Sequence, residues 1–308
     1  MAQQMVPARF YVGVTDEQWF RFLQNEPPLD EINFWSPSGR IIRAERGTPF
    51  LLKLKAPRNV IGGVGFVSLA ERMSIRDAWE FFKTKNGAPS LEELRRRIAA
   101  NRAQESASVD DEVGCIILSQ PTFFASPIPQ PEGWPPNLQA GKYYSSAEPV
   151  ARRVWHDVSI ALSAQPAVPA SAFGGYGQPV LQQVRLGQGA FRKLVLDAYE
   201  RRCAVSGEHT VPVLQASHIR PFADVAQHEI ANGLALRSDI HTLFDQGYVT
   251  ITPDYRFVVS DRLREDFDNG QVYYDYAKQR PTIFLPSDRE NYPSREHLEW
   301  HGLERFKK

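Results

Sequence analysis

Two histidines, an asparagine and an aspartate in the second half of the chain have the types and spacing of a hydrolytic metal site. His218, Asn232 and His241 follow one another within one short segment, and Asp245 lies four residues after His241. On a helix, residues at this spacing share one face. A histidine and a carboxylate on one face can bind a divalent metal. We therefore interpret residues 215–247 as the chemical centre of the protein.

The residues around these side chains predict a strand, a loop and a short helix. Residues 211–216 are apolar enough to form a strand that leads into His218. Ser238 is a candidate helix N-cap, and Gly247 is placed to end the helix. A strand–loop–helix unit of this size would bring the two histidines and the asparagine together.

The motifs in this segment resemble the HNH nuclease superfamily, which has the ββα-metal fold. The resemblance implies that His218 is the general base that activates a water, that Asn232 holds the loop and orients the base, and that His241 is a metal ligand. The likeness covers about residues 185–260 and rests on Ala216-x-His218-Ile219-x-Pro221, Asn232-Gly233-Leu234-x-Leu236 and His241-x-Leu243-Phe244-Asp245-x-Gly247.

Phosphodiester hydrolysis needs a nucleophilic water, relief of charge in the transition state and a stabilised leaving oxygen. A neutral imidazole with a pKa of about 6.5 can accept the proton of the water, and one metal ion, magnesium or manganese, can supply the other two requirements. Arg220 could contact a phosphate, because a guanidinium group matches phosphate oxygens in a bidentate way.

Two positions depart from the family pattern. Ser217 stands where many relatives carry an aspartate or histidine ligand, so Asp245 or Asp239 could complete the metal shell; Asp245 could instead cap the helix or bond Arg237. Cys203 keeps one of the four cysteine positions that hold a structural zinc in many relatives, and we expect no structural zinc here.

The composition is that of an ordinary globular protein. The 308 residues favour two domains over one, and 42% hydrophobic residues can build a core without disulfides. The 36 basic residues balance the 36 acidic ones, so bulk charge does not predict a nucleic-acid binder, although an uneven surface could still bind phosphates. Two cysteines far apart in sequence, no signal segment and no long apolar run predict a cytoplasmic protein without a membrane segment.

The first half of the chain predicts a mixture of strands and helices that resembles the PUA-like superfamily, with its EVE, SRA and ASCH modules. That resemblance implies a small curved barrel, which often accepts a modified base flipped out of a nucleic acid. Asn33, Phe34 and Trp35 are the candidate base contacts, with Trp19 a weaker one. Phe34 and Trp35 could equally be core residues. The strands are expected at 9–14, 50–55, 60–67 and 114–118, and the helices at 74–83 and 90–105.

The expected fold class is α+β, in two domains. Residues 1–163 form a PUA-like small β-barrel with helices, the reader domain; residues 164–183, rich in Ala, Pro, Gly, Ser and Gln, form a linker; residues 184–308 form the ββα-metal HNH nuclease.

This organisation is similar to the modification-dependent restriction enzymes of bacteria. The resemblance implies a metal-dependent endonuclease that hydrolyses double-stranded DNA carrying a modified base, such as a modified cytosine, after the reader flips that base. A homodimer would supply the two nuclease domains that cutting both strands needs. Two alternatives stay open: an HNH nuclease on unmodified DNA or RNA whose front domain binds another partner, and a catalytically degenerate DNA-binding module.

Overall fold

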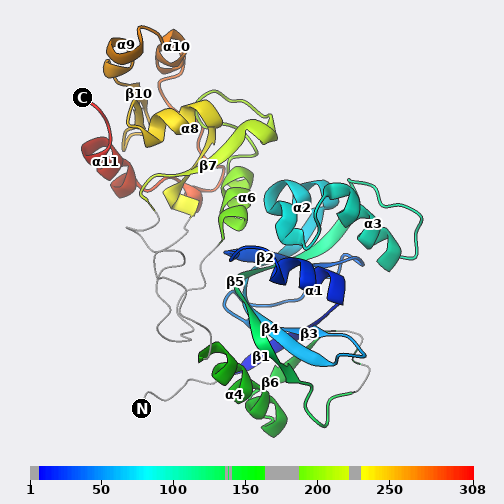
Figure 1. Cartoon of the computed structure of the whole chain (residues 1–308). Coiled ribbons are helices and arrows are strands. Elements are labelled where there is room, and N and C mark those ends of the chain that lie inside the picture. The colour runs from blue at the N-terminus through cyan, green and yellow to red at the C-terminus, as the bar shows by residue number, and fades with distance from the viewer. Residues whose placement is uncertain (1–6, 136–137, 139–140, 164–186, 222–229) are drawn as a thin grey trace, which may run out of the picture. The chain divides into compact units, whose positions relative to one another are not determined.

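Helices and strands occur together throughout the chain, which confirms the predicted α+β class (Figure 1). The computed structural model describes residues 7–135, 138, 141–163, 187–221 and 230–308. Contacts divide the chain into two compact units, Met1–Ala190 and Phe191–Lys308. The linker predicted at 164–183 lies outside the described residues. Within the described parts, every helix is too short or too polar to cross a membrane.

The first unit is built on one six-stranded sheet. Its strand order is β2-β5-β4-β3-β1-β6, and in the part of the chain that the structure describes the two outermost strands do not pair with each other. β1 and β3 are parallel, and every other pair is antiparallel. The strands are β1 (Arg9–Thr15), β2 (Glu31–Ser36), β3 (Pro49–Leu54), β4 (Val60–Ser74), β5 (Glu112–Pro129) and β6 (Lys142–Ser145).

Apolar side chains cover both faces of this sheet, because neighbouring residues of a strand point to opposite sides. On β3, Leu51 packs into a cluster with residues of helix α4 (Pro149–Ser163). Phe50 and Leu52 pack into a second cluster, with residues of helix α1 (Glu17–Gln24). All six residues of β3 are therefore buried, as its run of apolar residues predicts.

A buried asparagine joins strand β2 to the helices of the first unit. Asn86 donates hydrogen bonds from Nδ2 to the carbonyls of Ala78 and Lys83, both at 2.8 Å. Its Oδ1 accepts from Asn33 Nδ2 at 2.8 Å, and its carbonyl accepts from Trp35 Nε1 at 2.9 Å. This network fixes one side of β2. The elements around it are α2 (Ile75–Phe82), η1 (Lys83–Asn86) and α3 (Leu91–Asn101).

The second unit contains two small antiparallel sheets and several short helices. The strands β9 and β10 form one antiparallel pair, and β7–β8 lies in the segment of the two histidines. The strands are β7 (Leu214–His218), β8 (Gly233–Arg237), β9 (Val249–Ile251) and β10 (Phe257–Val259). The helices are α6 (Gln188–Ala198), η2 (Val211–Val213), η3 (Ile230–Asn232), α8 (Ser238–Asp245), α9 (Arg262–Phe267), α10 (Gln271–Gln279), η4 (Arg289–Asn291) and α11 (Arg295–Glu304).

The predicted strand–loop–helix unit is present, with two corrections at its ends. The strand begins at Leu214, because a single 3-10 turn occupies 211–213. Ser238 is the first helical residue rather than the N-cap; Arg237 holds the cap position and makes no side-chain capping bond. Because α8 starts directly after β8, the hairpin fixes where the helix begins.

Helix α8 is anchored near its C-terminal end by a buried histidine. Phe244 stacks on His301 of α11 with ring centroids 3.7 Å apart and an interplanar angle of 9°. The ring nitrogens of His301 hydrogen-bond Thr250 Oγ1 at 2.9 Å and the Phe244 carbonyl at 3.1 Å. His301 is thus a core residue, and burial lowers its pKa to about 4.

Gly247 ends helix α8, as predicted. Its φ is +76°, in the left-handed region that glycine adopts without strain. The Gly247 N–H donates to the Phe244 carbonyl at 3.0 Å, and the Tyr248 N–H donates to the Leu243 carbonyl at 2.9 Å. This pair of bonds is a Schellman motif, which satisfies the last carbonyls of the helix and turns the chain into β9.

Replacing Gly247 by alanine is expected to lower the free energy of unfolding by about 2 kcal/mol or more. A left-handed conformation costs an L-residue roughly 1–2 kcal/mol, and the new Cβ would lie 2.0 Å from the Arg305 carbonyl oxygen. The matched control is Gly302→Ala in α11, where a Cβ meets nothing within 4 Å and helix propensity gains up to about 1 kcal/mol. Urea denaturation measures both; equal effects would contradict the assignment.

Candidate active site

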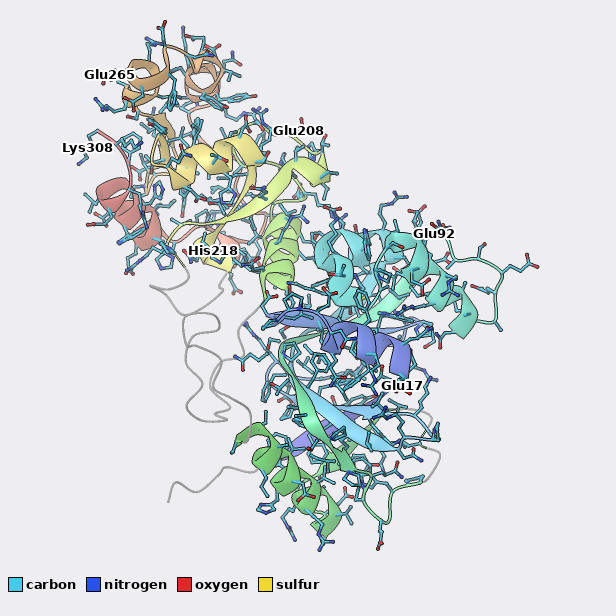
Figure 2. All side chains as sticks on the ribbon, in the orientation of Figure 1. Glu17, Glu92, Glu208, His218, Glu265 and Lys308 are labelled. Atoms are coloured by element: carbon cyan, nitrogen blue, oxygen red, sulfur yellow. The ribbon has the colours of Figure 1, made fainter. Side chains whose placement is uncertain are left out.

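His218 stands at the end of β7 against a helix. Its imidazole stacks on the ring of Phe191 in α6, with centroids 4.0 Å apart and planes 10° from parallel. Figure 2 labels this side chain in the second unit. Burial is the main cause that lowers the pKa of His218 to about 4; the neighbouring His241 acts in the same direction and Asp245 in the opposite one. At neutral pH the ring is therefore uncharged, which is the form that can accept a proton.

Asn232 holds the chain that follows His218. Its side chain is fully buried. Oδ1 accepts from the Arg220 N–H at 2.9 Å, Nδ2 donates to the Arg220 carbonyl at 3.1 Å, and the Asn232 carbonyl accepts from the Ile219 N–H at 2.9 Å. These three bonds fix the backbone just after His218, so the asparagine acts on the histidine through the main chain.

His241 and Asp245 lie on one face of α8, as their spacing predicts. His241 Nε2 is 3.2 Å from Asp245 Oδ2. On the other side of the ring, His241 Nδ1 is 2.6 Å from Oε1 of Gln215 on β7. The sequence interpretation missed Gln215. The signal that could have found it is strand alternation, because Gln215 and Ser217 share one face of β7.

Asp239 forms an ion pair with Arg237. Its carboxylate receives a bidentate hydrogen bond from Arg237, at 2.7 Å and 2.6 Å, and a third bond from Tyr273 Oη at 3.1 Å. The bonds from Arg237 hold the pKa of Asp239 below its usual range. Asp239 is therefore not available to a metal, and the alternative in which Asp245 bonds Arg237 is wrong: Asp245 pairs with His241.

Arg220 lies two residues after His218, and its side chain packs against helix α11. Its guanidinium carbon lies 5.2 Å from the centroid of the Trp300 ring, a cation–π arrangement, and Nη1 is 3.9 Å from Glu296 Oε1. The side chain is only partly exposed. Its place beside the Asn232-held backbone keeps it near the candidate base.

The donors on α8 fit a divalent cation. An imidazole nitrogen and a carboxylate oxygen face each other there, and Ser217 Oγ is buried with no hydrogen-bond partner among the described residues. The described residues contain no group of three or more His, Cys, Asp or Glu side chains placed to hold a metal. A cation here would keep several waters, as magnesium commonly does. Cys203 is buried, and its Sγ accepts from the N–H groups of Ser206 and Arg237.

The first unit contains a separate cavity of about 380 Å³. Phe34 and Trp35 line it, together with Trp19 and Tyr11. Phe34 meets Trp19 edge-to-face, with ring centroids 5.6 Å apart. Asn33 does not line this cavity: it is fully buried and donates to Asn86 Oδ1 and to a cysteine sulfur. The proposed base contact at Asn33 is therefore corrected to a structural role, because its amide is held by Asn86 and Cys115 inside the core.

Charged residues also line the cavity. Asp16 caps helix α1, its Oδ1 accepting from the Trp19 N–H at 2.8 Å. Arg40 and Lys55 are exposed at the cavity, and neither side chain has an ion-pair or hydrogen-bond partner among the described residues. The cavity thus combines aromatic walls with two exposed cationic side chains.

Comparison with known proteins gives one family match. Residues 203–252 match the family model described as HNH endonuclease. The search of curated proteins returned no match. The family assignment applies to this segment, which contains His218, Asn232, His241 and Asp245, and it confirms the resemblance that their motifs carry.

Solved structures resemble parts of the chain at low identity. A mutant ASCH protein from Zymomonas mobilis shares 7% identity, with a TM-score of 0.36 over 50% of this chain and 99% of that chain. The ASCH protein from the same organism shares 9% identity, with a TM-score of 0.34 over 48% and 94%. The modification-dependent TagI restriction endonuclease shares 14% identity, with a TM-score of 0.29 over 88% and 74%.

The imidazole of His218 is expected to titrate with a midpoint near pH 4. An unfolded histidine takes up its proton near pH 6.5, so between these values the unfolded chain binds more protons than the folded one. The free energy of unfolding should therefore fall as the pH drops from about 6.5 to 4, with His301 acting in the same direction. NMR titration of the metal-free protein, with the signal assigned by His218→Ala, measures the midpoint; a midpoint near 6.5 would refute the buried environment.

Proposed function

We propose that the protein is a metal-dependent DNA endonuclease that hydrolyses phosphodiester bonds, directed by its first unit to DNA carrying modified bases such as modified cytosine. One observation carries the nuclease part: a neutral His218 ends β7 in the same ββα unit that pairs His241 with Asp245. This unit lies in the segment that matches the HNH endonuclease model.

His218 is the proposed general base. Its uncharged ring accepts a proton from a water, the water oxygen forms a bond to phosphorus, and the bond from phosphorus to the leaving oxygen breaks. Phe191 holds the plane of the ring by stacking, and Asn232 fixes the backbone that follows it. The base is thus positioned before substrate arrives, so little reorganisation is needed during the reaction.

His241 and Asp245 are the proposed ligands of a magnesium or manganese ion. When bound, such an ion supplies charge relief on the phosphate and stabilises the leaving oxygen. Arg220 is the proposed phosphate contact, since its guanidinium group is anchored by Trp300 next to the backbone that Asn232 holds. A guanidinium in this place would bind the non-reacting phosphate oxygens.

His218→Ala is expected to lower the rate of DNA cleavage by about 10²–10⁴-fold, because general-base catalysis contributes this much, while DNA binding is retained. Cleavage of a labelled duplex with magnesium or manganese, alongside a gel-shift measurement of binding, tests both. His156→Ala in α4 is the matched control and should cut like the parent. Unchanged cutting by His218→Ala would exclude its role as the base.

The cavity of the first unit is the proposed reader of the modified base. Its volume of about 380 Å³ falls in the range of small-ligand sites. Phe34 and Trp35 offer aromatic faces on which a flipped base can stack. The exposed side chains of Arg40 and Lys55 supply positive charge for the phosphates that flank such a base. We retain the PUA-like assignment for this unit as part of the proposal.

A homodimer is proposed for the cutting of both strands, since each chain contains one HNH segment. The competing function is an HNH nuclease whose first unit binds another partner. The 36 basic residues balance the 36 acidic ones, so the chain has no excess of positive charge that would attract DNA. This balance favours the alternative. The substrate comparison below separates the two.

Cutting is expected to be confined to one duplex in a set of unmodified, methylcytosine, hydroxymethylcytosine and glucosylated hydroxymethylcytosine DNA. Arg40→Ala and Lys55→Ala should each weaken binding to that duplex and lower the slope of log K against log salt by about 1, since each removes one phosphate contact. Arg153→Ala, an exposed arginine of α4 outside the cavity, is the control. Equal cutting of all four duplexes would remove the reader role and leave the nuclease.

A further inference from the structure

We propose that Gln215 is a positioning residue of the metal centre, which holds His241 with its proton on Nδ1 and so leaves Nε2 open toward Asp245. The metal-binding part of this proposal rests on the function proposed above. The positioning part rests only on the geometry of the second unit, where Gln215 Oε1 lies 2.6 Å from His241 Nδ1.

The strand register puts Gln215 in reach of α8. Gln215 pairs with Leu236 of β8, and α8 begins only two residues later at Ser238. The side chain of Gln215 is exposed and shares its face of β7 with Ser217. A residue on the opposite face of the strand, such as Ala216, could not make this contact.

The contact determines where the proton of His241 sits. A carbonyl oxygen only accepts hydrogen bonds, so Oε1 of Gln215 requires the proton on Nδ1. The Nε2 atom of a neutral ring then carries a lone pair, 3.2 Å from the Asp245 carboxylate, which also only accepts. Two acceptors at this distance need a second ring proton or a cation between them. A metal ion at Nε2 meets this need, and a hydrogen bond at the other ring nitrogen commonly orients a histidine ligand.

The opposite amide orientation gives the opposite result. If Gln215 presented its NH₂ group to Nδ1, the proton would have to sit on Nε2 and bond Asp245. That arrangement would satisfy every polar atom but would close Nε2 to a metal. The two tautomers of His241 therefore distinguish a metal-positioning glutamine from an ordinary surface hydrogen bond.

Two substitutions separate these roles. Gln215→Glu keeps an oxygen acceptor at the same reach and should retain the Nδ1–H tautomer. Gln215→Leu keeps the approximate size but removes the acceptor, so the proton should move to Nε2, where Asp245 accepts it. Gln279→Leu, an exposed glutamine at the end of α10, is the matched control for a glutamine-to-leucine change in the same unit.

The tautomer is read directly by long-range ¹H–¹⁵N NMR on the metal-free full chain labelled at its seven histidines. The His241 signals are assigned by their loss in His241→Asn. We expect Nδ1–H in the parent, Gln215→Glu and Gln279→Leu, and Nε2–H in Gln215→Leu. Titration with Mn²⁺, followed by its EPR signal, should show about 10–100-fold weaker binding for Gln215→Leu and no weakening for the other two variants.

An Nε2–H tautomer in the parent protein, or a Gln215→Leu protein with parental tautomer and Mn²⁺ affinity, would overturn the proposal. Failure of the nuclease function gives a different pattern. If the parent cuts no DNA but Gln215→Leu still shifts the tautomer and weakens Mn²⁺ binding, the positioning role of Gln215 stands. The proposed nuclease function is then the part that is wrong.

Discussion

The pairing of β7 with β8 is the constraint on which the candidate site depends. It sets His218 opposite Gly233, and it delivers the chain into α8 directly after β8. Gly233 allows α6 to approach this hairpin closely, because a Cβ there would lie 2.4 Å from Val195 Cγ2. The same helix supplies Phe191, whose ring stacks on His218. One short ladder therefore fixes the candidate base, its aromatic support and the start of α8.

Burial keeps both His218 and His301 of the second unit uncharged at neutral pH, although the two side chains have different roles. Each has its pKa lowered to about 4 by loss of solvent. His301 hydrogen-bonds through both ring nitrogens inside the core and anchors α8. His218 lies at the end of a strand, partly exposed, where its neutral ring can meet a water. The packing that stabilises the unit thus also prepares the base, because desolvation disfavours the charged ring in both places.

Features that depend on local spacing, such as those of α8, could be predicted from the sequence. Contacts that depend on how strands pair could not. His241 and Asp245 share a face because a helix fixes residues four apart, and Gly247 ends that helix because it accepts a positive φ. Strand alternation places Gln215 on the face of β7 that holds Ser217, but its contact with His241 also requires the β7–β8 pairing, which local spacing does not give. Asn33 was misplaced for a related reason: its hydrogen bond to Asn86 joins residues far apart in sequence, which no local pattern reveals.

The cavity and the candidate nuclease site are made of separate sets of residues. Every described residue that lines the cavity belongs to the first unit, and His218, Asn232, His241 and Asp245 all belong to the second. Under the proposed function, the covalent connection is enough to couple them, because binding by one unit would raise the local concentration of the other at the same DNA. The cavity would then determine which DNA is held, and the ββα unit would need no base specificity of its own. A nuclease site made mostly of backbone-held side chains and phosphate contacts suits that division, since phosphate contacts position a protein without reading sequence.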